Sequence, residues 1–408
     1  MKRIIAAMLI LLMVAGCARS PAQESIDKTE QQYMSGEEKT VLEHGNELEP
    51  ETAGETKETE ARQSQPAVEE DPRVPVKVKG IYLSAYVAGM PDMLDSIIAE
   101  IEKSQINAVV IDVKNDDGRV TFPVDVDEVN EIGASKGYIP DVGEMIRKLK
   151  EKDIYVIGRV VAFRDPYLAE KKPEWSLKTA DGGIYRDNKG LAWVNPYKKE
   201  VWDYLLEIGK AAGETGFDEI QFDYIRFSTE KGMRNVVFDE EDTKGRSKTD
   251  VISEFVRYVY DPLKAEGLFV SADVFGAIIG SQVDADSVGQ IYRDMALSLD
   301  YICPMIYPSH YGDGNFGIEH PDTQPYDTVL AALLGSQEDL ATASDGGRTE
   351  ETAVVRPWLQ DFTASYLKHY IKYGPEQLKA QIQAVHDAGY EEWMFWDAAC
   401  TYDWKGLE

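Results

Sequence analysis

The chain has 408 residues and a formal net charge of −30 at pH 7, with 73 acidic residues against 43 basic ones. Binding to phosphate groups needs clustered Lys and Arg, so this acidity argues against nucleic acid or an anionic surface as a partner. A neutral or cationic substrate agrees better with the composition.

The first seventeen residues have the pattern of a bacterial lipoprotein signal peptide. They begin MKR, continue with an apolar stretch too short to span a bilayer comfortably, and place the small residues Ala15 and Gly16 before Cys17. The last four residues, VAGC, resemble a lipobox, which implies lipidation of Cys17. We therefore expect a signal peptide over 1–17 and a location on the extracytoplasmic face of the cell membrane, with the lipid as the only membrane contact. A plain secretory signal is the alternative.

Residues 18–74 predict a disordered acidic linker. This stretch is rich in Glu, Gln, Thr, Ser, Pro and Gly and has one aromatic residue, Tyr33. Such a composition buries too little apolar surface to offset the entropy of an ordered chain. The folded domain is therefore expected over 75–408.

The folded part alternates short apolar runs with amphipathic stretches. The runs lie at 79–86, 108–114, 155–163, 219–227, 268–276, 301–308, 355–362 and 392–398. Helix patterns lie between them, at 93–104, 141–152, 198–214, 250–267, 287–300, 327–335 and 375–389. Eight such repeats predict a (β/α)8 TIM barrel whose eighth helix is reduced or missing, because few residues follow the last run. A Rossmann fold would need a GxGxxG turn, which SAYVAGMPD (84–92) does not offer.

A long connection over 164–196 follows the third run. It contains Trp175, Tyr185 and Trp193 around the turn signals DGG and NKG, which predict a small hairpin. The rings could stack on sugars or form a satellite core, and the sequence does not decide between the two.

Acidic residues break the apolar runs near their carboxyl ends, where TIM barrels carry their active sites. They are Asp112, Asp223, Asp273, Asp361 and Asp397. Clustered acids raise each other's pKa, so that one carboxyl can stay protonated beside an ionised one, as glycosidic bond cleavage requires. We predict Asp223, Asp273 and Asp361 as catalytic residues. The alternative is that these acids cap helices or pair with Arg159 and Arg226.

The remaining polar and aromatic residues at the predicted barrel mouth suit sugar binding. The predicted substrate-binding residues are Tyr86, Asp112, Arg159, Trp193, Arg226, Tyr307, His310, Gln360, Trp396 and Asp397. Trp358 lies beside them in the seventh run and could equally be core.

We expect no cofactor and no metal. A zinc hydrolase needs several imidazole ligands at strand ends, and of the five His only His310 is expected near the mouth, with His320 as a further candidate. Calcium or magnesium bound by Asp residues is left open. Cys303 and Cys400 are expected to be buried thiols, or to form a single bridge.

Three motifs carry a resemblance to a known family. GFDEIQFDYIRF (216–227), with WVNPYKKEVWDYLLEIGKAA (193–212) and CPMIYPSHY (303–311), resembles a bacterial family of uncharacterised glycoside hydrolases, often lipoproteins, whose barrels look related to the α-amylase superfamily. The resemblance covers about 75–405.

In α-amylase-like barrels the nucleophile ends strand four, the general acid follows strand five and a supporting Asp follows strand seven. The resemblance implies these roles for Asp223, Asp273 and Asp361, with departures: strand five offers Asp instead of Glu, no His precedes Asp361, and Gln221 stands where an Arg is expected. A chitinase-like reading is disfavoured, because Ile225 stands where the catalytic Glu would be. The predicted function is hydrolysis of an extracellular or cell-wall polysaccharide, and the alternative is a non-catalytic carbohydrate-binding barrel.

Overall fold

The computed structural model describes residues 71–341 and 352–408. The expected signal peptide, Cys17 and the linker up to residue 70 lie outside the described residues. Within the described ranges, no helix has the length and apolar character needed to cross a bilayer. The two cysteines in these ranges, Cys303 and Cys400, are both free thiols.

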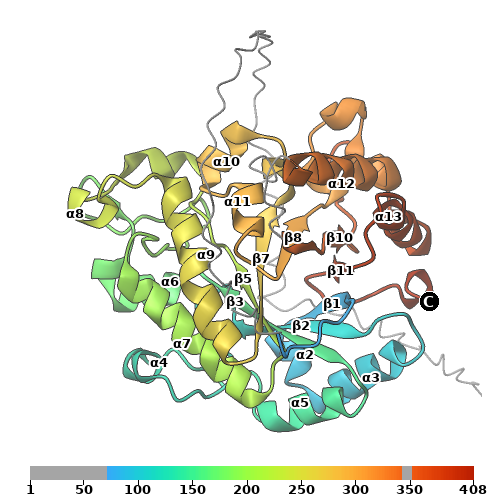
Figure 1. Ribbon diagram of the computed structural model, residues 1–408, viewed down its shortest axis with the longest axis horizontal. Coiled ribbons are helices and arrows are strands. Elements are labelled where there is room, and N and C mark those ends of the chain that lie inside the picture. The colour runs from blue at the N-terminus through green and yellow to red at the C-terminus, as the bar shows by residue number, and fades with distance from the viewer. Residues whose placement is uncertain (1–70, 342–351) are drawn as a thin grey trace, which may run out of the picture. The chain divides into compact units, whose positions relative to one another are not determined.

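The strands form a closed parallel barrel, which confirms the predicted TIM fold (Figure 1). Each predicted apolar run supplies one barrel position. In order around the barrel these are β1 (Lys79–Leu83), β2 (Ala108–Lys114), β3 (Tyr155–Val161), β5 (Glu219–Asp223), β7 (Phe269–Phe275), β8 (Tyr301–Met305), β9 (Val354–Val355) with β10 (Trp358–Gln360), and β11 (Trp393–Trp396). Pairing of β8 with β10, and of β11 with both β10 and β1, closes the ring.

The seventh barrel position is split into two short strands. Pro357 lies between β9 and β10 and has no backbone N–H to donate to a ladder. The backbone still follows the barrel, because Arg356 N donates to Ile302 O at 2.9 Å and Met394 N donates to Pro357 O at 2.9 Å.

Helices surround the barrel (Figure 1). The outer helices are α3 (Pro91–Ile101), α5 (Val142–Lys150), α7 (Lys199–Thr215), α9 (Lys248–Ala265), α10 (Gln282–Val288), α11 (Tyr292–Ala296), α12 (Pro325–Ala341) and α13 (Pro375–Asp387). Shorter elements in the connections are α2 (Ala85–Ala88), α4 (Asp127–Ile132), α6 (Pro166–Lys171), α8 (Glu240–Thr243) and the antiparallel pair β4 (Lys178–Thr179) and β6 (Val236–Val237). The last strand is followed only by a 3-10 turn, Trp404–Gly406, as expected for a reduced eighth helix.

The single helix predicted over 287–300 is wrong. Gly289 adopts a left-handed φ of 84° and ends α10, and a separate short helix, α11, follows. The apolar spacing continues through Gly289, so periodicity alone could not reveal this break.

Two apolar cores separate the layers of the domain. One cluster lies inside the barrel and includes Val110, Ile157, Cys303 and Met394. The larger cluster lies between the strands and the surrounding helices. Inward and outward residues alternate along each strand, so the two cores follow from the period of two in the sequence.

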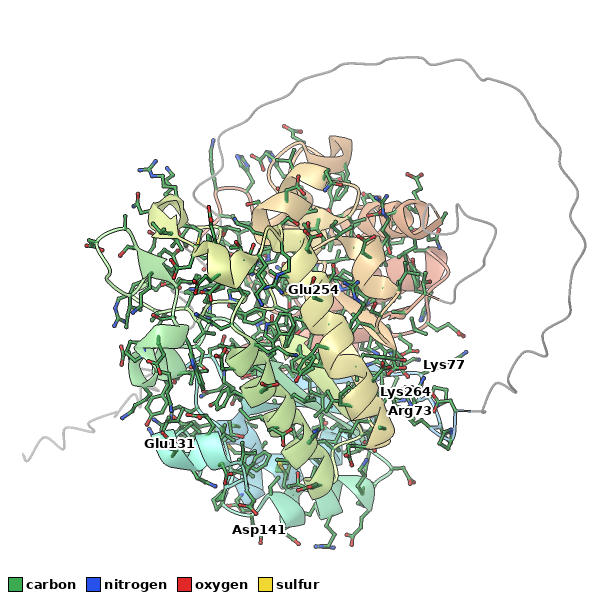
Figure 2. The ribbon with its side chains drawn as sticks, turned by 60° about the vertical axis from the view of Figure 1, so that its left-hand side comes forward. Arg73, Lys77, Glu131, Asp141, Glu254 and Lys264 are labelled. Atoms are coloured by element: carbon green, nitrogen blue, oxygen red, sulfur yellow. The ribbon has the colours of Figure 1, made fainter. Side chains whose placement is uncertain are left out.

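The described chain begins at the amino-terminal end of the barrel. Arg73 donates to Leu268 O at 2.6 Å and forms an ion pair with Asp300 at 2.8 Å, and these two residues immediately precede β7 and β8. Figure 2 shows Arg73 close to Lys77 and Lys264 on one side of the molecule. Arg73, two residues before the predicted start of the domain at 75, is therefore held against the barrel.

Candidate active site

Strand β5 ends at Asp223 and does not continue to residue 227 as predicted. Tyr224 adopts a left-handed φ of 53°, which an extended strand cannot accommodate. Its N–H donates to Oδ1 of Asp223 at 2.6 Å. Such a backbone conformation is costly for a non-glycine residue, and the Asp223 carboxyl helps to hold it.

Arg159 joins three acids at the carboxyl end of the barrel. Its Nε and Nη2 donate to Oδ2 of Asp223 at 2.9 and 2.6 Å, and its Nη1 donates to Asp112 at 2.7 Å and to Asp116 at 3.1 Å. The structure thus brings Asp112, Arg159 and Asp223 together, and the pairing of these acids with Arg159 is what the ion-pair interpretation expects. Burial raises the pKa of Asp112 to about 6, although the charge of Arg159 opposes the shift.

Asp273 lies on β7, the strand adjacent to β5, and has a different environment. The register pairs Phe222 with Ala272, so Asp223 and Asp273 follow at neighbouring positions on the same face. Asp273 is 2% exposed, and its Oδ1 accepts a hydrogen bond from Nε1 of Trp358 at 2.7 Å. Burial, and then the charge of Asp223, raise the pKa of Asp273 well above its usual range. The protonated form of Asp273 is therefore favoured relative to a free Asp, beside an Asp223 that is ion-paired with Arg159.

Three aromatic side chains pack beside these acids. Tyr82 donates from its hydroxyl to Oδ2 of Asp112 at 2.7 Å and stacks on Trp396 with ring centroids 4.1 Å apart. Trp396 meets Trp358 edge to face at 5.7 Å and lies 5.3 Å from the guanidinium of Arg159. Trp358 and Trp396 therefore border the acid cluster from two neighbouring strands.

Asp361 and Asp397 form a second acidic pair, after β10 and β11. The N–H groups of Ala399 and Thr401 donate to Asp397 at 3.2 and 2.8 Å. Burial raises the pKa of Asp361 to about 8, and the charge of Asp397 adds to the shift. The protonated form of Asp361 is therefore favoured near neutral pH.

Tyr307, His310 and Gln360 gather between the ends of β8 and β10. His310 packs edge to face on Tyr307 with centroids 4.9 Å apart, and Gln360 accepts from Ser309 N at 3.0 Å. Nε2 of His310 is shielded from solvent, and burial lowers the pKa of this imidazole to about 4. Gln360 is fully buried and also donates to Asp322 at 3.0 Å, so it connects two loops in the structure.

Three predicted binding residues pack against aromatic rings. Trp193 is fully buried in the outer core, where Tyr185 is also buried, as expected if these rings serve as core residues. The guanidinium of Arg226 lies 4.4 Å from Phe275, 5.2 Å from Trp193 and 5.0 Å from Tyr224, the residue that follows Asp223. Tyr86 is 58% exposed on α2 and packs against Tyr138.

The sequence interpretation missed three residues of the cluster, and it left Trp358 open between the subsite and the core. Tyr82 lies within β1, and Asp116 and Arg164, which form an ion pair, lie in the loops after β2 and β3. The signal for the loop residues was present: NDDG directly follows the second apolar run, and Arg164 directly follows the third. Loops at the carboxyl ends of barrel strands are where functional residues are expected.

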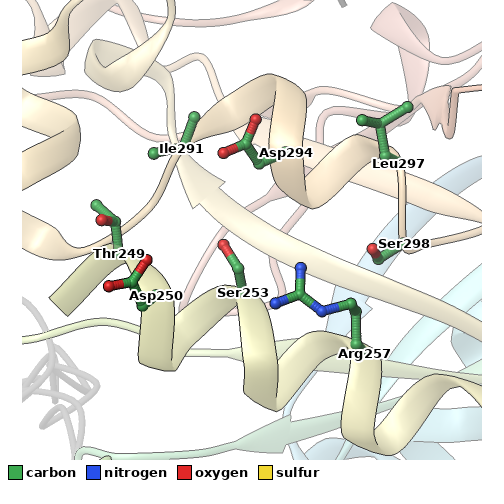
Figure 3. Close-up of a pocket in the computed structure, with 8 residues that line it drawn as sticks. All are labelled: Thr249, Asp250, Ser253, Arg257, Ile291, Asp294, Leu297 and Ser298. Carbon is green, nitrogen blue, oxygen red and sulfur yellow. The ribbon is translucent and has the colours of Figure 1, made fainter. Parts of the chain in front are cut away.

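A cavity of about 240 Å³ lies elsewhere, in the helical layer (Figure 3). Residues of α9, of α11 and of the segments beside α11 line it: Thr249, Asp250, Ser253, Arg257, Ile291, Asp294, Leu297 and Ser298. None of the strand-end acids lines this cavity, so we do not place the candidate site there.

The fold and the acid cluster define a parallel (β/α)8 barrel with titratable groups at the carboxyl ends of its strands, the arrangement found in enzymes of this fold. Residues 80–402 match the family described as "Putative glycosyl hydrolase domain", and the chain belongs to that family. No curated protein is found to be similar to this chain in sequence.

Two solved structures of low sequence identity share the fold, and a third, of higher identity, matches about half of this chain. The PgaB (BpsB) glycoside hydrolase domain from Bordetella bronchiseptica is 12% identical, with 79% of this chain and 94% of that chain covered and a TM-score of 0.55. α-L-Fucosidase isoenzyme 2 from Paenibacillus thiaminolyticus is 13% identical, with 82% of this chain and 47% of that chain covered and a TM-score of 0.50. A hypothetical protein from Ruminiclostridium thermocellum ATCC 27405 is 41% identical over 48% of this chain and 97% of that chain, with a TM-score of 0.44.

Proposed function

We propose that this chain hydrolyses glycosidic bonds in an extracellular or cell-wall polysaccharide, with Asp223 and Asp273 as its essential carboxyl groups. One observation carries the proposal: the two acids lie near the carboxyl ends of neighbouring strands, yet Asp223 is ion-paired with Arg159 while Asp273 is buried against the indole N–H of Trp358. Glycosidic cleavage needs a carboxylic acid and a carboxylate that flank one bond. Membership of a glycosyl hydrolase family supports the same reaction class.

The environments suggest how the roles divide. Asp273, whose pKa is raised, is suited to donate a proton to the departing oxygen. Asp223, ion-paired with Arg159, is suited to attack or stabilise the anomeric carbon as a carboxylate. Asp361 is the third candidate, in the supporting position that the α-amylase-like resemblance implies.

We also propose that the protein is a lipoprotein attached through Cys17 outside the cytoplasm. The sequence VAGC supports this location. Arg73 is held at the amino-terminal end of the barrel, so a linker from the membrane would enter opposite to the acid cluster. Cell fractionation tests the anchor: Cys17→Ala should move the protein out of the membrane fraction, and unchanged retention there would contradict it.

Replacement of Asp223 by Asn tests the catalytic proposal. The purified protein is screened against a panel of polysaccharides, and turnover by Asp223→Asn and Asp273→Asn is measured on any glycan that the wild type cleaves. Loss of a positioned acid or base costs about 10²–10⁴-fold in rate, and we expect at least about 10³-fold for Asp223→Asn. Glycan binding should stay nearly unchanged, because the side-chain volume is conserved.

Asp286→Asn is the matched control, because Asp286 is an exposed acid on α10. It should retain full activity. Turnover that survives in Asp223→Asn would overturn the proposed role. Glycan binding by the wild type without turnover of any panel member would favour the alternative, a non-catalytic carbohydrate-binding barrel.

A further inference from the structure

Two loops at the carboxyl end of the barrel bring together two imidazoles and a carboxylate. Asp313 and His320 lie in the loop after β8, and His369 lies in the loop after β10. One ligand atom from each of the three side chains lies within 4.8 Å of the other two. The His320 and His369 rings are stacked in parallel, with centroids 3.8 Å apart and an interplanar angle of 4°.

The arrangement is fixed by a buried carboxylate behind it. Asp322, two residues after His320, accepts from the N–H of Ile371 at 3.3 Å, and Ile371 is two residues after His369. Asp322 also accepts from Gln360 at 3.0 Å and is 2% exposed. The two loops are thus joined next to the imidazoles, so the side chains are held near one another before any ligand binds.

The environment of His320 points to a cation. Its Nδ1 is shielded from solvent and lies 3.0 Å from Oδ1 of Asp313, in a contact that does not have the geometry of a hydrogen bond. A positive charge, either a proton on the imidazole or a metal ion, would favour this approach of the two atoms. With bonds of about 2.0–2.2 Å, the ligand atoms of a tetrahedral zinc ion lie roughly 3.3–3.5 Å apart. The Asp313–His320 separation is close to this value, and rotation of the half-buried His369 side chain would complete the set.

We propose that Asp313, His320 and His369 bind a divalent transition-metal ion of the Zn²⁺ class. Imidazole nitrogen with a carboxylate oxygen suits zinc, whereas Ca²⁺ and Mg²⁺ prefer oxygen ligands alone. Three protein ligands leave a fourth position for water. This site was not predicted, because the two His are 49 positions apart in the chain (369 − 320) and only the fold brings them together.

The ion would clamp two loops at the end of the barrel that carries the acid cluster. The loop after β8 also carries Tyr307 and His310, and Tyr307 packs on Phe362 after β10 with centroids 5.7 Å apart. Binding would therefore restrain this side of the mouth and stabilise the fold without taking part in bond cleavage. The proposal is independent of the glycosidase function.

Metal binding to the full chain, purified without a histidine tag and stripped with a chelator, tests the proposal. Zn²⁺ is titrated by calorimetry, and bound metal is counted after desalting. We expect one equivalent bound and a rise in melting temperature. His369→Gln and Asp313→Asn should each weaken binding at least about tenfold, because each removes one ligand.

Two features of the design keep the result decisive. Asp313 is 64% exposed, so Asp313→Asn should fold normally even if a histidine variant does not. His386→Gln, at an exposed position of α13, is the matched control and should bind like the wild type. Co²⁺ in place of Zn²⁺ should give visible absorption bands from the metal and no thiolate charge-transfer band. A thiolate charge-transfer band would indicate Cys ligands instead. Absence of binding by the wild type, unchanged affinity in Asp313→Asn and His369→Gln, or a thiolate band would each overturn the proposal.

Discussion

The two ends of the barrel interior each hold a buried arginine among acids, but the acids are satisfied to different degrees. At the amino-terminal end, Arg356 donates to both oxygens of Glu219 at 2.9 and 3.0 Å and to Glu392 at 2.9 Å. At the carboxyl end, Arg159 pairs with Asp112, Asp116 and Asp223, whereas the Asp273 carboxyl accepts a hydrogen bond from the indole N–H of Trp358 and forms no ion pair within the described ranges.

The amino-terminal cluster is closed and highly connected. Glu219 also accepts from Ser271 at 2.5 Å and from Tyr155 at 3.1 Å, and both Glu219 and Arg356 are completely buried. Nothing in such a network can reach a substrate without dismantling it. We therefore assign this end a structural role.

The carboxyl-terminal cluster differs because its acids have different partners and different environments. Asp273 and Asp361 have raised pKa values, whereas Asp223 is paired with Arg159. A network in which every acid is ion-paired would offer no carboxylic acid that could donate a proton. The comparison teaches that a buried ion pair alone does not mark an active site. A stronger indication is a pair of neighbouring acids of which one is ion-paired and the other has no cationic partner.

The largest effect is expected from breaking the amino-terminal network. Arg356→Met leaves Glu219 and Glu392 buried without their cation, and loss of one partner from a buried ion pair typically costs about 3–5 kcal/mol. We expect a decrease of that size in the free energy of unfolding, measured by denaturant titration at pH 7. If activity is found, the folded fraction should retain it.

Arg293→Met provides the comparison for this measurement. Arg293 is an exposed residue of α11, 3.7 Å from Asp294, and its loss should change stability by less than about 0.5 kcal/mol. A similar small change in Arg356→Met would show that the amino-terminal network is not needed for stability.

The sequence was sufficient for the barrel and for part of the site. The strands and the approximate positions of Asp112, Asp223 and Asp273 follow from apolar runs and from acids at their ends. The break at Gly289 and the left-handed Tyr224 were not predictable, because backbone conformation at single residues leaves no trace in the periodicity.

Contacts between residues that are distant in the chain could not be predicted either. Trp358 meets Asp273 across 85 positions, and no local pattern distinguishes this Trp from an ordinary core residue. The protonation state of Asp273 depends on that neighbour and on burial, so it follows only from the fold. The sequence pattern pointed to the acids, and only the resemblance to α-amylase-like barrels implied a division of their roles.

A medium effect is expected on the pH dependence of stability. The pKa of Asp361 is about 8 in the folded state, against about 3.9 for an unfolded Asp. Between these values the folded state binds more protons than the unfolded state, so this group makes stability fall as pH rises, by up to about 1.4 kcal/mol per pH unit. Asp361→Asn removes the titration, and its stability relative to the wild type should increase from pH 5 to pH 8.

Denaturant unfolding at several pH values measures this difference. Asp286→Asn again serves as the control, because an exposed acid should leave the pH dependence unchanged. A constant offset between Asp361→Asn and the wild type across this pH range would show that Asp361 is ionised when folded, and the carboxyl end would then lose one of its protonated acids.

The smallest effect is expected from Trp358→Phe, which removes a hydrogen-bond donor to Asp273 and leaves the Asp273 side chain itself unchanged. The indole N–H bonds the carboxyl at 2.7 Å and lowers its pKa, against the larger opposing contributions of burial and Asp223. Removal of this donor should raise the pKa of Asp273 further. On a glycan that the enzyme cleaves, the alkaline limb of the pH–rate profile should move to higher pH by about one unit or less, because the general acid stays protonated up to a higher pH.

Trp393→Phe is the control for this measurement. It removes a similar buried ring whose indole nitrogen makes no hydrogen bond in the described structure, so the alkaline limb of its pH–rate profile should not move. Equal shifts in the two variants would mean that packing, not the hydrogen bond, sets the proton affinity at this end of the barrel.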